Sequence, residues 1–242
     1  MNQICAFLMG QCHVGLVGNP GSYVLIDAGF PGTMGAFLRA IKRIGAEPKD
    51  LRAIVITHFH YDHVGCLARI RDLSGAGVIV HAAEAEAMRK GEMLVPVGTN
   101  RFARAIVRAF RGPAARPHRT AAGNPTIVID REYDLSRFGV GGRIIPTPGH
   151  TRGSVSVILD SGDAFIGDAA ANMPLVNRKS VFPPFAEEPA KLAQTWAALL
   201  ETNAGTFHPA HGGPFDRAKL AASLAAFPWA RTGSRPSKDI TA

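Results

Sequence analysis

The sequence predicts an α/β fold, and three observations support this class. Strand-like apolar runs alternate with helical runs along most of the chain. Its most chemically versatile residues stand where such a run stops and a Gly or Pro turn begins, which is where α/β folds collect their functional groups. The 242 residues are enough to bury a sizeable core, and no linker divides them. We therefore expect one domain over residues 1–242, with a loose tail from about residue 228.

Apolar patterns and turn residues predict the elements of the N-terminal half. Strands are expected over residues 1–10, 14–17, 23–26, 52–57 and 78–80. A Gly-Asn-Pro-Gly turn at residues 18–21 joins the second strand to the third as a hairpin. Helices are expected over residues 34–44, 64–73 and 82–89, the second of them ended by Gly75.

The C-terminal half continues the same alternation after a long irregular segment. A basic amphipathic helix is predicted over residues 101–111, and residues 112–125 form a loop. Three strands follow over residues 143–146, 154–159 and 164–166. Two helices, over residues 189–201 and 217–227, complete the fold before the tail, in which Trp229 folds back onto the body.

The densest group of polar residues is Thr57-His58-Phe59-His60-Tyr61-Asp62-His63, directly after the strand at residues 52–57. Because the chain stays extended just beyond this strand, His58 and His60 point the same way and can share one metal ion. Asp62 is predicted to be the N-cap of the next helix, which carries Asp62 and His63 to the opposite side. These two residues can hold a second ion.

Three further candidates stand at other strand ends: His150 after Pro148-Gly149, Asp168 after Gly167, and His211 after Pro209-Ala210. Imidazole and carboxylate donors without a thiolate suit zinc and also accept iron, manganese or nickel. Three histidines leave a fourth position for water, and a carboxylate between two ions about 3.5–4 Å apart holds them as a pair. We expect two divalent ions, zinc first, with iron or manganese as alternatives.

In this order, His58-x-His60-x-Asp62-His63, His150, Asp168 and His211 resemble the motif set of the metallo-β-lactamase superfamily, over nearly all of residues 13–215. The resemblance implies a four-layer αββα sandwich with its metal ions in a groove at the edge of two sheets. It also implies the ligand sets: His58, His60 and His150 for one ion, Asp62, His63 and His211 for the other, and Asp168 as the bridge.

The expected chemistry is metal-assisted hydrolysis, in which a hydroxide held between the two ions attacks a carbonyl or phosphoryl centre. Asp62 is a hypothetical proton donor to the leaving group. Asp27 ends the strand at residues 23–26 and resembles the family's acidic residue beneath the ligands, where a carboxylate accepts an imidazole N–H. An Asp before Ala-Gly is also a common turn former, so both roles stay open for Asp27.

The retained Asp168 resembles lactonases, glyoxalase II-type thioesterases and phosphodiesterases more than true β-lactamases, which lack an aspartate there. We therefore expect a small ester, lactone or thioester as substrate. Acyl-homoserine lactonases place a tyrosine shortly after this aspartate, whereas Ala-Ala-Ala-Asn stands at residues 169–172 here, and Asn172 is a candidate for the substrate groove. The chain after His211 is expected to be too short for the glutathione-binding domain of glyoxalase II.

A different enzyme class also fits the motifs. Persulfide dioxygenases resemble this set and use a single iron on the counterparts of His58, His150 and Asp168. A mono-iron oxidoreductase of that kind is therefore the alternative to a hydrolase. Among hydrolases, the alternative is a glyoxalase II-type thioesterase. The remaining histidines, His13, His81, His118 and His208, are expected to lie outside the ligand set.

The predicted helix at residues 101–111 has a basic side and an apolar side. Its arginines are Arg101, Arg104, Arg108 and Arg111, opposite Phe102, Ile106 and Phe110. With a net charge of +8, this face could attract an anionic or acyl-bearing small molecule, which makes Arg104 and Arg108 candidates for the groove. Periodicity alone favours a helix whose basic face is merely solvated and whose apolar face packs on the body, and nucleic acid is not the favoured partner.

Three cysteines, Cys5, Cys12 and Cys66, form no CxxC pair, which indicates buried thiols in a reducing compartment. The first residues lack the basic start of a signal peptide, and no apolar run has membrane-spanning length. We expect a cytoplasmic enzyme acting on a small molecule. A homo-oligomer stays open.

Overall fold

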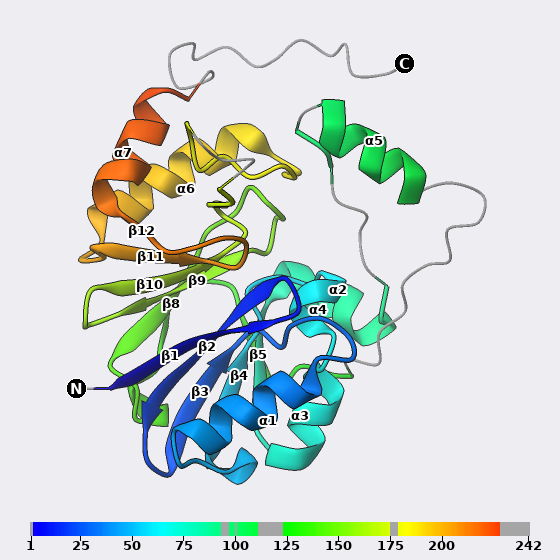
Figure 1. Ribbon diagram of the computed structural model, residues 1–242, viewed down its shortest axis with the longest axis vertical. Helices are drawn as coiled ribbons and strands as arrows, with labels where there is room; N and C mark the ends of the chain where they lie inside the picture. The colour runs from blue at the N-terminus through cyan, green and yellow to red at the C-terminus, as the bar shows by residue number, and fades with distance from the viewer. Residues whose placement is uncertain (1, 93–96, 100, 111–122, 175–178, 228–242) are drawn as a thin grey trace.

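Two sheets and two sets of helices build the molecule in the computed structural model, which describes residues 2–92, 97–99, 101–110, 123–174 and 179–227. The sheets face each other, α1, α3 and α4 lie on the outer side of one, and α6 and α7 lie on the outer side of the other (Figure 1). The layers therefore run helix, sheet, sheet, helix, which confirms the expected αββα arrangement.

The first sheet contains six strands in chain order. They are β1 (Gln3–Met9), β2 (Cys12–Asn19), β3 (Ser22–Ile26), β4 (Leu51–Val55), β5 (Gly77–His81) and β6 (Ile127–Ile129). The first three strands pair antiparallel through tight turns, and β3 to β6 pair in parallel. Since parallel strands require crossovers, the chain leaves this sheet between them, and the crossover helices α1, α3 and α4 lie on one of its faces.

The second sheet also contains six strands, ordered β12-β11-β10-β9-β8-β7. Their bounds are β7 (Tyr133–Asp134), β8 (Gly142–Pro146), β9 (Val155–Leu159), β10 (Asp163–Gly167), β11 (Thr206–Pro209) and β12 (Phe215–Asp216). Only β10 and β11 pair in parallel, joined by helix α6. The carboxyl ends of β10 and β11 therefore meet at one edge of this sheet.

The helices are α1 (Met34–Arg43), α2 (Tyr61–Val64), α3 (Leu67–Ser74), α4 (Ala82–Lys90), α5 (Arg101–Phe110), α6 (Pro189–Glu201) and α7 (Arg217–Ala225), with short 3-10 helices at Pro48–Asp50 and Ser136–Phe138. Successive side chains along a strand pack on opposite faces of the sheet. Leu25 packs toward the helices of its own sheet, whereas Val24 and Ile26 pack between the two sheets. Trp196 of α6 is fully buried in a third core, beneath α6 and α7.

Most of the predicted elements are confirmed, and the differences are local. The predicted strand at residues 52–57 stops at Val55. The strands β6, β7 and β12 were not predicted, and β11 was expected only as a strand end before His211. The predicted helix over residues 64–73 is broken at Gly65 and Cys66 into α2 and α3. Beside this break, a side chain at Gly65 would collide with the backbone of Pro31, at 2.1 Å, so only glycine allows the two segments to pass this closely.

The predicted role of Asp62 as an N-cap is wrong. His60 occupies the N-cap of α2, with extended backbone, and Asp62 lies within the first turn. A carboxylate is still favourable at that position because it faces the positive end of the helix dipole. Residue type alone favours Asp62 as the cap, but the extended chain continues as far as His60 and the helix begins directly after it.

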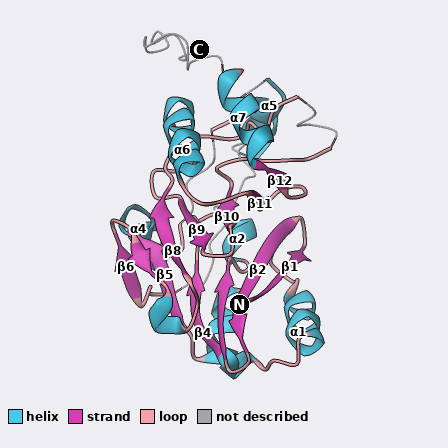
Figure 2. Cartoon of the chain, turned by 90° about the vertical axis from the view of Figure 1, so that its left-hand side faces the viewer, coloured by secondary structure: helices cyan, strands magenta, loops and turns pink. Residues whose placement is uncertain are grey.

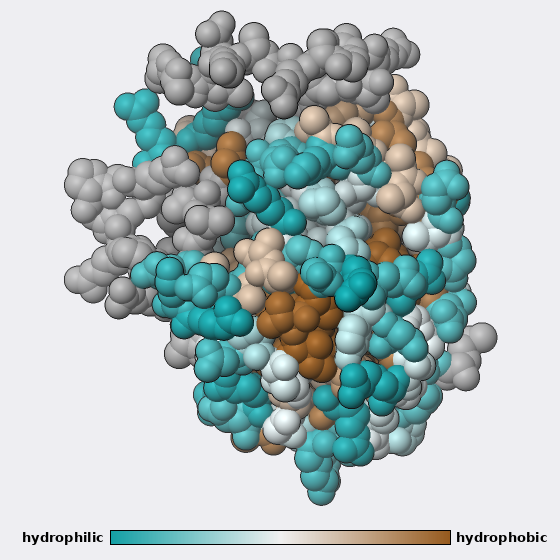
Figure 3. Space-filling view, turned by 180° about the vertical axis from the view of Figure 1, so that it is seen from behind, coloured by the Kyte–Doolittle hydropathy of each residue, from teal (hydrophilic) through white to brown (hydrophobic). Residues whose placement is uncertain are grey.

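The surface seen from behind is mostly hydrophilic and includes a hydrophobic area near its centre (Figure 3). Large hydrophobic side chains that are exposed in the described residues come from separate elements: Leu8, Leu38, Leu73, Val97 and Val128. Within the described part of the chain, no helix has the length and apolar character to cross a membrane. The predicted tail from residue 228, including Trp229, lies outside the described residues, and the single-domain organisation stays a prediction.

Candidate metal centre

The seven candidate residues come together at one end of the sandwich, although they come from five separate segments. His58 and His60 follow β4, Asp62 and His63 belong to α2, and the other three follow β8, β10 and β11: His150, Asp168 and His211. Figure 2 shows α2 at this end, between β10 and β2. Two backbone hydrogen bonds join the two sheets here: Val155 N donates to Thr57 O (2.8 Å), and His13 N donates to Ala210 O (2.8 Å).

Three histidines, His58, His60 and His150, form what we call the histidine trio. His58 Nε2 lies 3.0 Å from His60 Nδ1, and His150 Nε2 lies 3.1 Å from each of those atoms. A tetrahedral ion with nitrogen ligands at about 2.0–2.1 Å needs nitrogens about 3.4 Å apart, slightly wider than this triangle. All three side chains are buried. The trio thus has the dimensions of one face of a tetrahedral metal site.

Hydrogen bonds on the outer sides of the rings indicate where the imidazole protons lie. His150 Nδ1 is 2.9 Å from the carbonyl oxygen of Phe185, which can only accept, so the proton is on Nδ1. His58 Nδ1 is 3.2 Å from the hydroxyl of Thr57, which itself donates to Asp27 at 2.8 Å. The Nε2 atoms of His58 and His150 therefore present lone pairs to the interior of the trio, an arrangement that a cation stabilises.

Asp62, His63 and His211 form a second group, the mixed trio. His211 Nε2 is 3.2 Å from Asp62 Oδ2, and His63 Nε2 is 3.9 Å from the same oxygen. His211 Nδ1 lies 3.1 Å from the carbonyl oxygen of Gln11, which leaves Nε2 free for a ligand. His63 Nε2 is buried and has no hydrogen-bond partner in the described structure, an arrangement that costs about 1–3 kcal/mol without a ligand.

Asp168 lies between the two trios and turns one oxygen to each. Its Oδ2 is 3.5 Å from His150 Nε2, while its Oδ1 is 3.5 Å from His211 Nε2 and 3.6 Å from His63 Nε2. Oδ1 is buried without a hydrogen-bond partner in the described structure. The orphaned atoms and the convergent nitrogen and oxygen donors fit divalent metal ions.

Asp27 supports the centre from below. It accepts hydrogen bonds from Thr57 N (2.8 Å) and Thr57 Oγ1, and its Oδ2 is 2.9 Å from His63 Nδ1. Its backbone has a φ of 66°, and its N–H donates to the carbonyl oxygen of Val55. Asp27 thus serves as a turn residue and also contacts a candidate ligand, so its two expected roles are compatible.

The two trios have opposite electrostatics. In the histidine trio, burial and neighbouring imidazoles lower the pKa of His60 to about 3 and that of His58 well below its usual value. In the mixed trio, burial acts to lower the pKa of His211, but Asp168 and Asp62 outweigh it and raise that pKa to about 9. Without a bound ion, His58 and His60 are therefore neutral at pH 7, whereas His211 is protonated on both ring nitrogens and carries a positive charge.

Sequence reasoning did not connect Cys12 or Thr57 with this centre. The Sγ atom of Cys12 lies 4.0 Å from His63 Nδ1, and burial raises the pKa of its thiol to about 11, so the thiol is neutral at physiological pH. Only the pairing of β1, β2 and β3 brings Cys12 beneath His63. Cys66, in contrast, donates to the carbonyl oxygen of Phe30 and takes no part in either trio, as expected for a packed thiol.

The candidate groove residues lie outside both trios. The side chain of Asn172 donates to Gly213 O (2.9 Å) and accepts from Lys219 Nζ (2.6 Å), which ties it to the loop after His211. Arg104 and Arg108 are exposed on α5, which lies away from both sheets in Figure 1. Among the side chains of α5 that the structure describes, Ala103 and Val107 are buried. Arg111 and the side chains of Phe102, Ile106, Ala109 and Phe110 lie outside the described residues.

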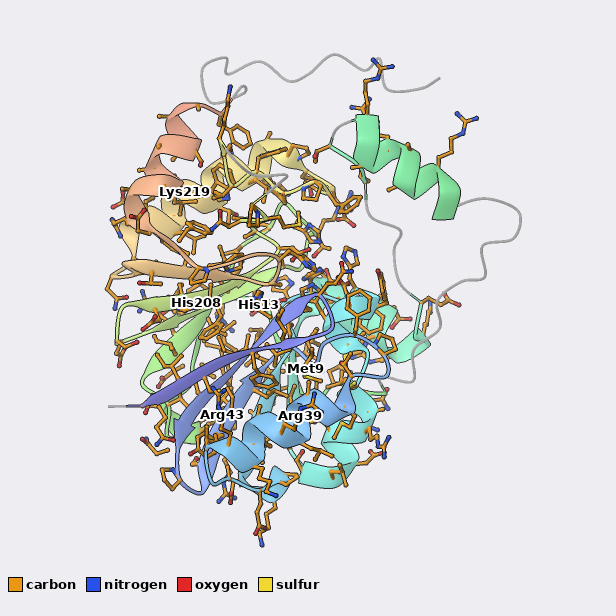
Figure 4. All side chains as sticks on the ribbon, in the orientation of Figure 1. Met9, His13, Arg39, Arg43, His208 and Lys219 are labelled. Carbon is orange, nitrogen blue, oxygen red and sulfur yellow. The ribbon has the colours of Figure 1, made fainter. Side chains whose placement is uncertain are left out.

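Three of the remaining histidines have structural partners. His13 on β2 and His208 on β11 lie near the meeting of the two sheets (Figure 4), where His208 Nε2 is 2.8 Å from Asp163 Oδ1. His13 Nδ1 is 3.3 Å from the carbonyl oxygen of Ala210. His81 caps α4 by accepting from the N–H of Ala83. His118 lies outside the described residues.

A family model described as the metallo-beta-lactamase superfamily matches residues 8–211 of the chain. The chain belongs to the metallo-β-lactamase superfamily. A metallo-beta-lactamase family protein from Thermus thermophilus superposes with a TM-score of 0.67 over 93% of this chain and 78% of that one, at 20% identity. A likeness at that identity concerns the fold, and it agrees with the αββα layers.

Relatives within the metallo-β-lactamase superfamily carry general names. A probable metallo-hydrolase of Mycobacterium tuberculosis is 34% identical over 182 residues, which cover 65% of this chain and 56% of that protein. A probable metallo-hydrolase of Bacillus subtilis is 28% identical over 155 residues, covering 64% of this chain and 58% of that protein. The matches thus span little more than half the length of these relatives.

Proposed function

We propose that this chain is a dinuclear metallohydrolase that cleaves a small ester, lactone or thioester. One observation carries the proposal, namely the position of Asp168. Its two oxygens approach His150 on one side and His63 and His211 on the other, all at 3.5–3.6 Å. A carboxylate that serves two donor groups in this way suits a pair of ions and gives no advantage to one ion alone.

In this proposal, the histidine trio holds one ion, the mixed trio holds the other, and Asp168 contacts both. Bound divalent ions, zinc first and iron or manganese as alternatives, would supply an activated water and a Lewis acid for the substrate oxygen. Asp27 fixes the ring of His63 through Nδ1, and the hydroxyl of Thr57 does the same for His58. Asp62 is the candidate to pass a proton to the leaving atom.

The surroundings of Asp168 bear on the substrate class. Ala169 and Ala170 are buried in the core beneath α6 and α7, and Ala171 is buried as well, so small apolar residues stand where lactonases place a tyrosine. Asn172 is the first polar side chain after them, and its amide is engaged by backbone carbonyls and Lys219. Substrate recognition would therefore depend on other segments, among which the exposed Arg104 and Arg108 suit an anionic or acyl-bearing molecule.

A mono-iron persulfide dioxygenase is the competing function. It would use His58, His150 and Asp168, all of which are close together. The proximity of Asp62, His63 and His211 to Asp168 favours hydrolysis, because a mono-iron centre gives these three residues no ligand role. A cytoplasmic location stays part of the proposal, and it agrees with Cys5, Cys12 and Cys66 being free thiols.

Metal analysis combined with two assays tests the proposal. The protein is stripped of metal, reloaded with zinc, manganese or iron in turn, and then analysed for bound metal. Each form is assayed on a panel of esters, lactones and thioesters, and separately for oxygen uptake with glutathione persulfide. Two ions per chain with hydrolysis of panel members would support the proposal. One iron per chain with oxygen consumption and no hydrolysis would overturn it.

A further inference from the structure

Helix α4 contains a buried carboxylate that neither the motifs nor the proposed reaction accounts for. Glu84 lies in the first turn of α4 and is only 7% exposed. Its neighbour on the same helix, Glu86, is exposed and pairs with Arg89 (3.4 Å) and Lys90 (3.2 Å) at the surface. Glutamate is almost never fully buried unless it has partners, so the partners of Glu84 indicate why it is there.

Both oxygens of Glu84 accept hydrogen bonds from the backbone of ligand-bearing loops. Oε2 accepts from Phe59 N at 3.1 Å, and Phe59 stands between His58 and His60. Oε1 accepts from Gly153 N at 3.1 Å, three residues after His150. A single carboxylate therefore joins the two loops that supply the histidine trio, although His58 and His150 are 92 positions apart in the sequence.

The approach on the Gly153 side is close and specific. A Cβ atom at this glycine would lie 2.5 Å from Cγ of Glu84, so the loop can approach the carboxylate only because residue 153 has no side chain. Hydrogen bonds to an ionised acceptor are about twice as strong as neutral ones, and burial strengthens them further. The position in the first turn of α4 also favours the negative charge through the helix dipole.

We propose that Glu84 is a positioning residue for the histidine trio, which sets the distance between the His58–His60 segment and His150. This inference rests on the proposed function to the extent that the trio holds an ion. The mixed trio is held by other partners, Asp27 on His63 and Gln11 on His211. Loss of Glu84 should therefore weaken one metal site and leave the other nearly unchanged.

The test compares Glu84→Gln with Glu86→Gln, a matched change of an exposed glutamate on the same helix. Glutamine keeps the size of the side chain but offers one acceptor, and its NH₂ group then faces a backbone N–H. Metal-free proteins are titrated with cobalt, whose visible absorption reports the geometry of each site, and with zinc against a chelator. In Glu84→Gln we expect one of the two sites to bind about 10–100-fold more weakly with an altered cobalt spectrum. Glu86→Gln should behave like the wild type.

A double variant separates positioning from a general effect on folding. If Glu84 acts through the histidine trio, Glu84→Gln should weaken metal binding much less in a His150→Ala background than in the wild type. Glu84→Asp, which keeps the charge but cannot reach both loops, provides the same test should the glutamine variant fold poorly. Unchanged affinities and spectra in both Glu84 variants, with only a lower melting temperature, would overturn the inference.

The same titration distinguishes this inference from the function on which it rests. A wild-type protein that binds only one ion would overturn the dinuclear proposal, yet the ion on the histidine trio would still respond to Glu84→Gln. A wild-type protein that binds two ions, with neither affected by Glu84→Gln, would overturn the role of Glu84 alone. A wild-type protein that binds no ion would overturn both.

Discussion

Metal binding at the two trios should respond to pH in different ways, because their histidines start from different protonation states. His211 of the mixed trio has its pKa raised to about 9: burial lowers it, but Asp168 and Asp62 more than compensate. Its Nδ1 contacts the carbonyl oxygen of Gln11, so the proton that an incoming ion displaces is the one on Nε2. In the histidine trio, burial lowers the pKa of His60 to about 3 and that of His58 well below its usual value, so neither of these two rings has a second proton to lose at neutral pH.

The size of the effect follows from the pKa of His211. At pH 7 its ring lies about two units below a pKa of about 9, so removing the proton costs about 3 kcal/mol of the binding free energy. The sign is fixed, because the unprotonated ring is the ligand and a higher pH exposes it. Affinity at the mixed trio should rise about tenfold per pH unit from pH 6 to pH 9, and then level off. The raised pKa of His63 can only add to this slope.

Calorimetric titration in buffers of different ionisation enthalpy measures how many protons the protein releases when each ion binds, at pH values from about 6 to about 10. We expect one ion to displace about one proton or more from the mixed trio when it binds at pH 7, and the share of His211 should decline as the pH rises through its pKa of about 9. Water bound to an ion also ionises near neutral pH, so His211→Ala is the control that retains that contribution and loses the histidine proton. Identical proton counts in the wild type and His211→Ala at pH 7 would refute the reasoning.

Three further predictions concern side chains in and around the centre. Asp168→Ala should weaken both metal sites and reduce the rate of hydrolysis by orders of magnitude. His81→Ala, which removes a helix cap, is the control and should leave the turnover rate within a small factor of the wild-type rate. Full activity in a folded, metal-poor Asp168→Ala protein would contradict the two-metal mechanism. Asp27→Asn keeps the left-handed backbone but offers fewer acceptors to Thr57 and His63, so chemical denaturation should show a loss of about 1–3 kcal/mol, together with weaker metal binding. The double variant Arg104→Gln and Arg108→Gln should have a lower kcat/KM for an anionic substrate at low salt and a nearly unchanged kcat/KM at high salt. Equal values of kcat/KM for the wild type and the double variant at low salt would show that this face is only solvated.

The sequence was sufficient to predict the αββα layers, through the resemblance to a family, and to name seven residues that the fold brings close together. Strands such as β3 and β9 carry strong apolar patterns, and helix α6 runs over the residues predicted for it, Pro189–Glu201. The His58-x-His60-x-Asp62-His63 motif places four donors within one turn region, so local geometry alone constrains them. Short strands escaped prediction, because β7 and β12 have two residues each and are defined only by their partners in the sheet.

Tertiary structure alone decided how those donors are held. The carbonyl oxygens that orient His150 and His211 belong to Phe185 and Gln11, and the distance between Gln11 and His211 along the chain is 200 residues. The close passage of Gly65 against Pro31, beside the break between α2 and α3, is a contact that no local propensity encodes. The contacts of Glu84 with Phe59 and Gly153 depend on where α4 packs, so its burial and its link to the histidine trio exist only once the chain has folded.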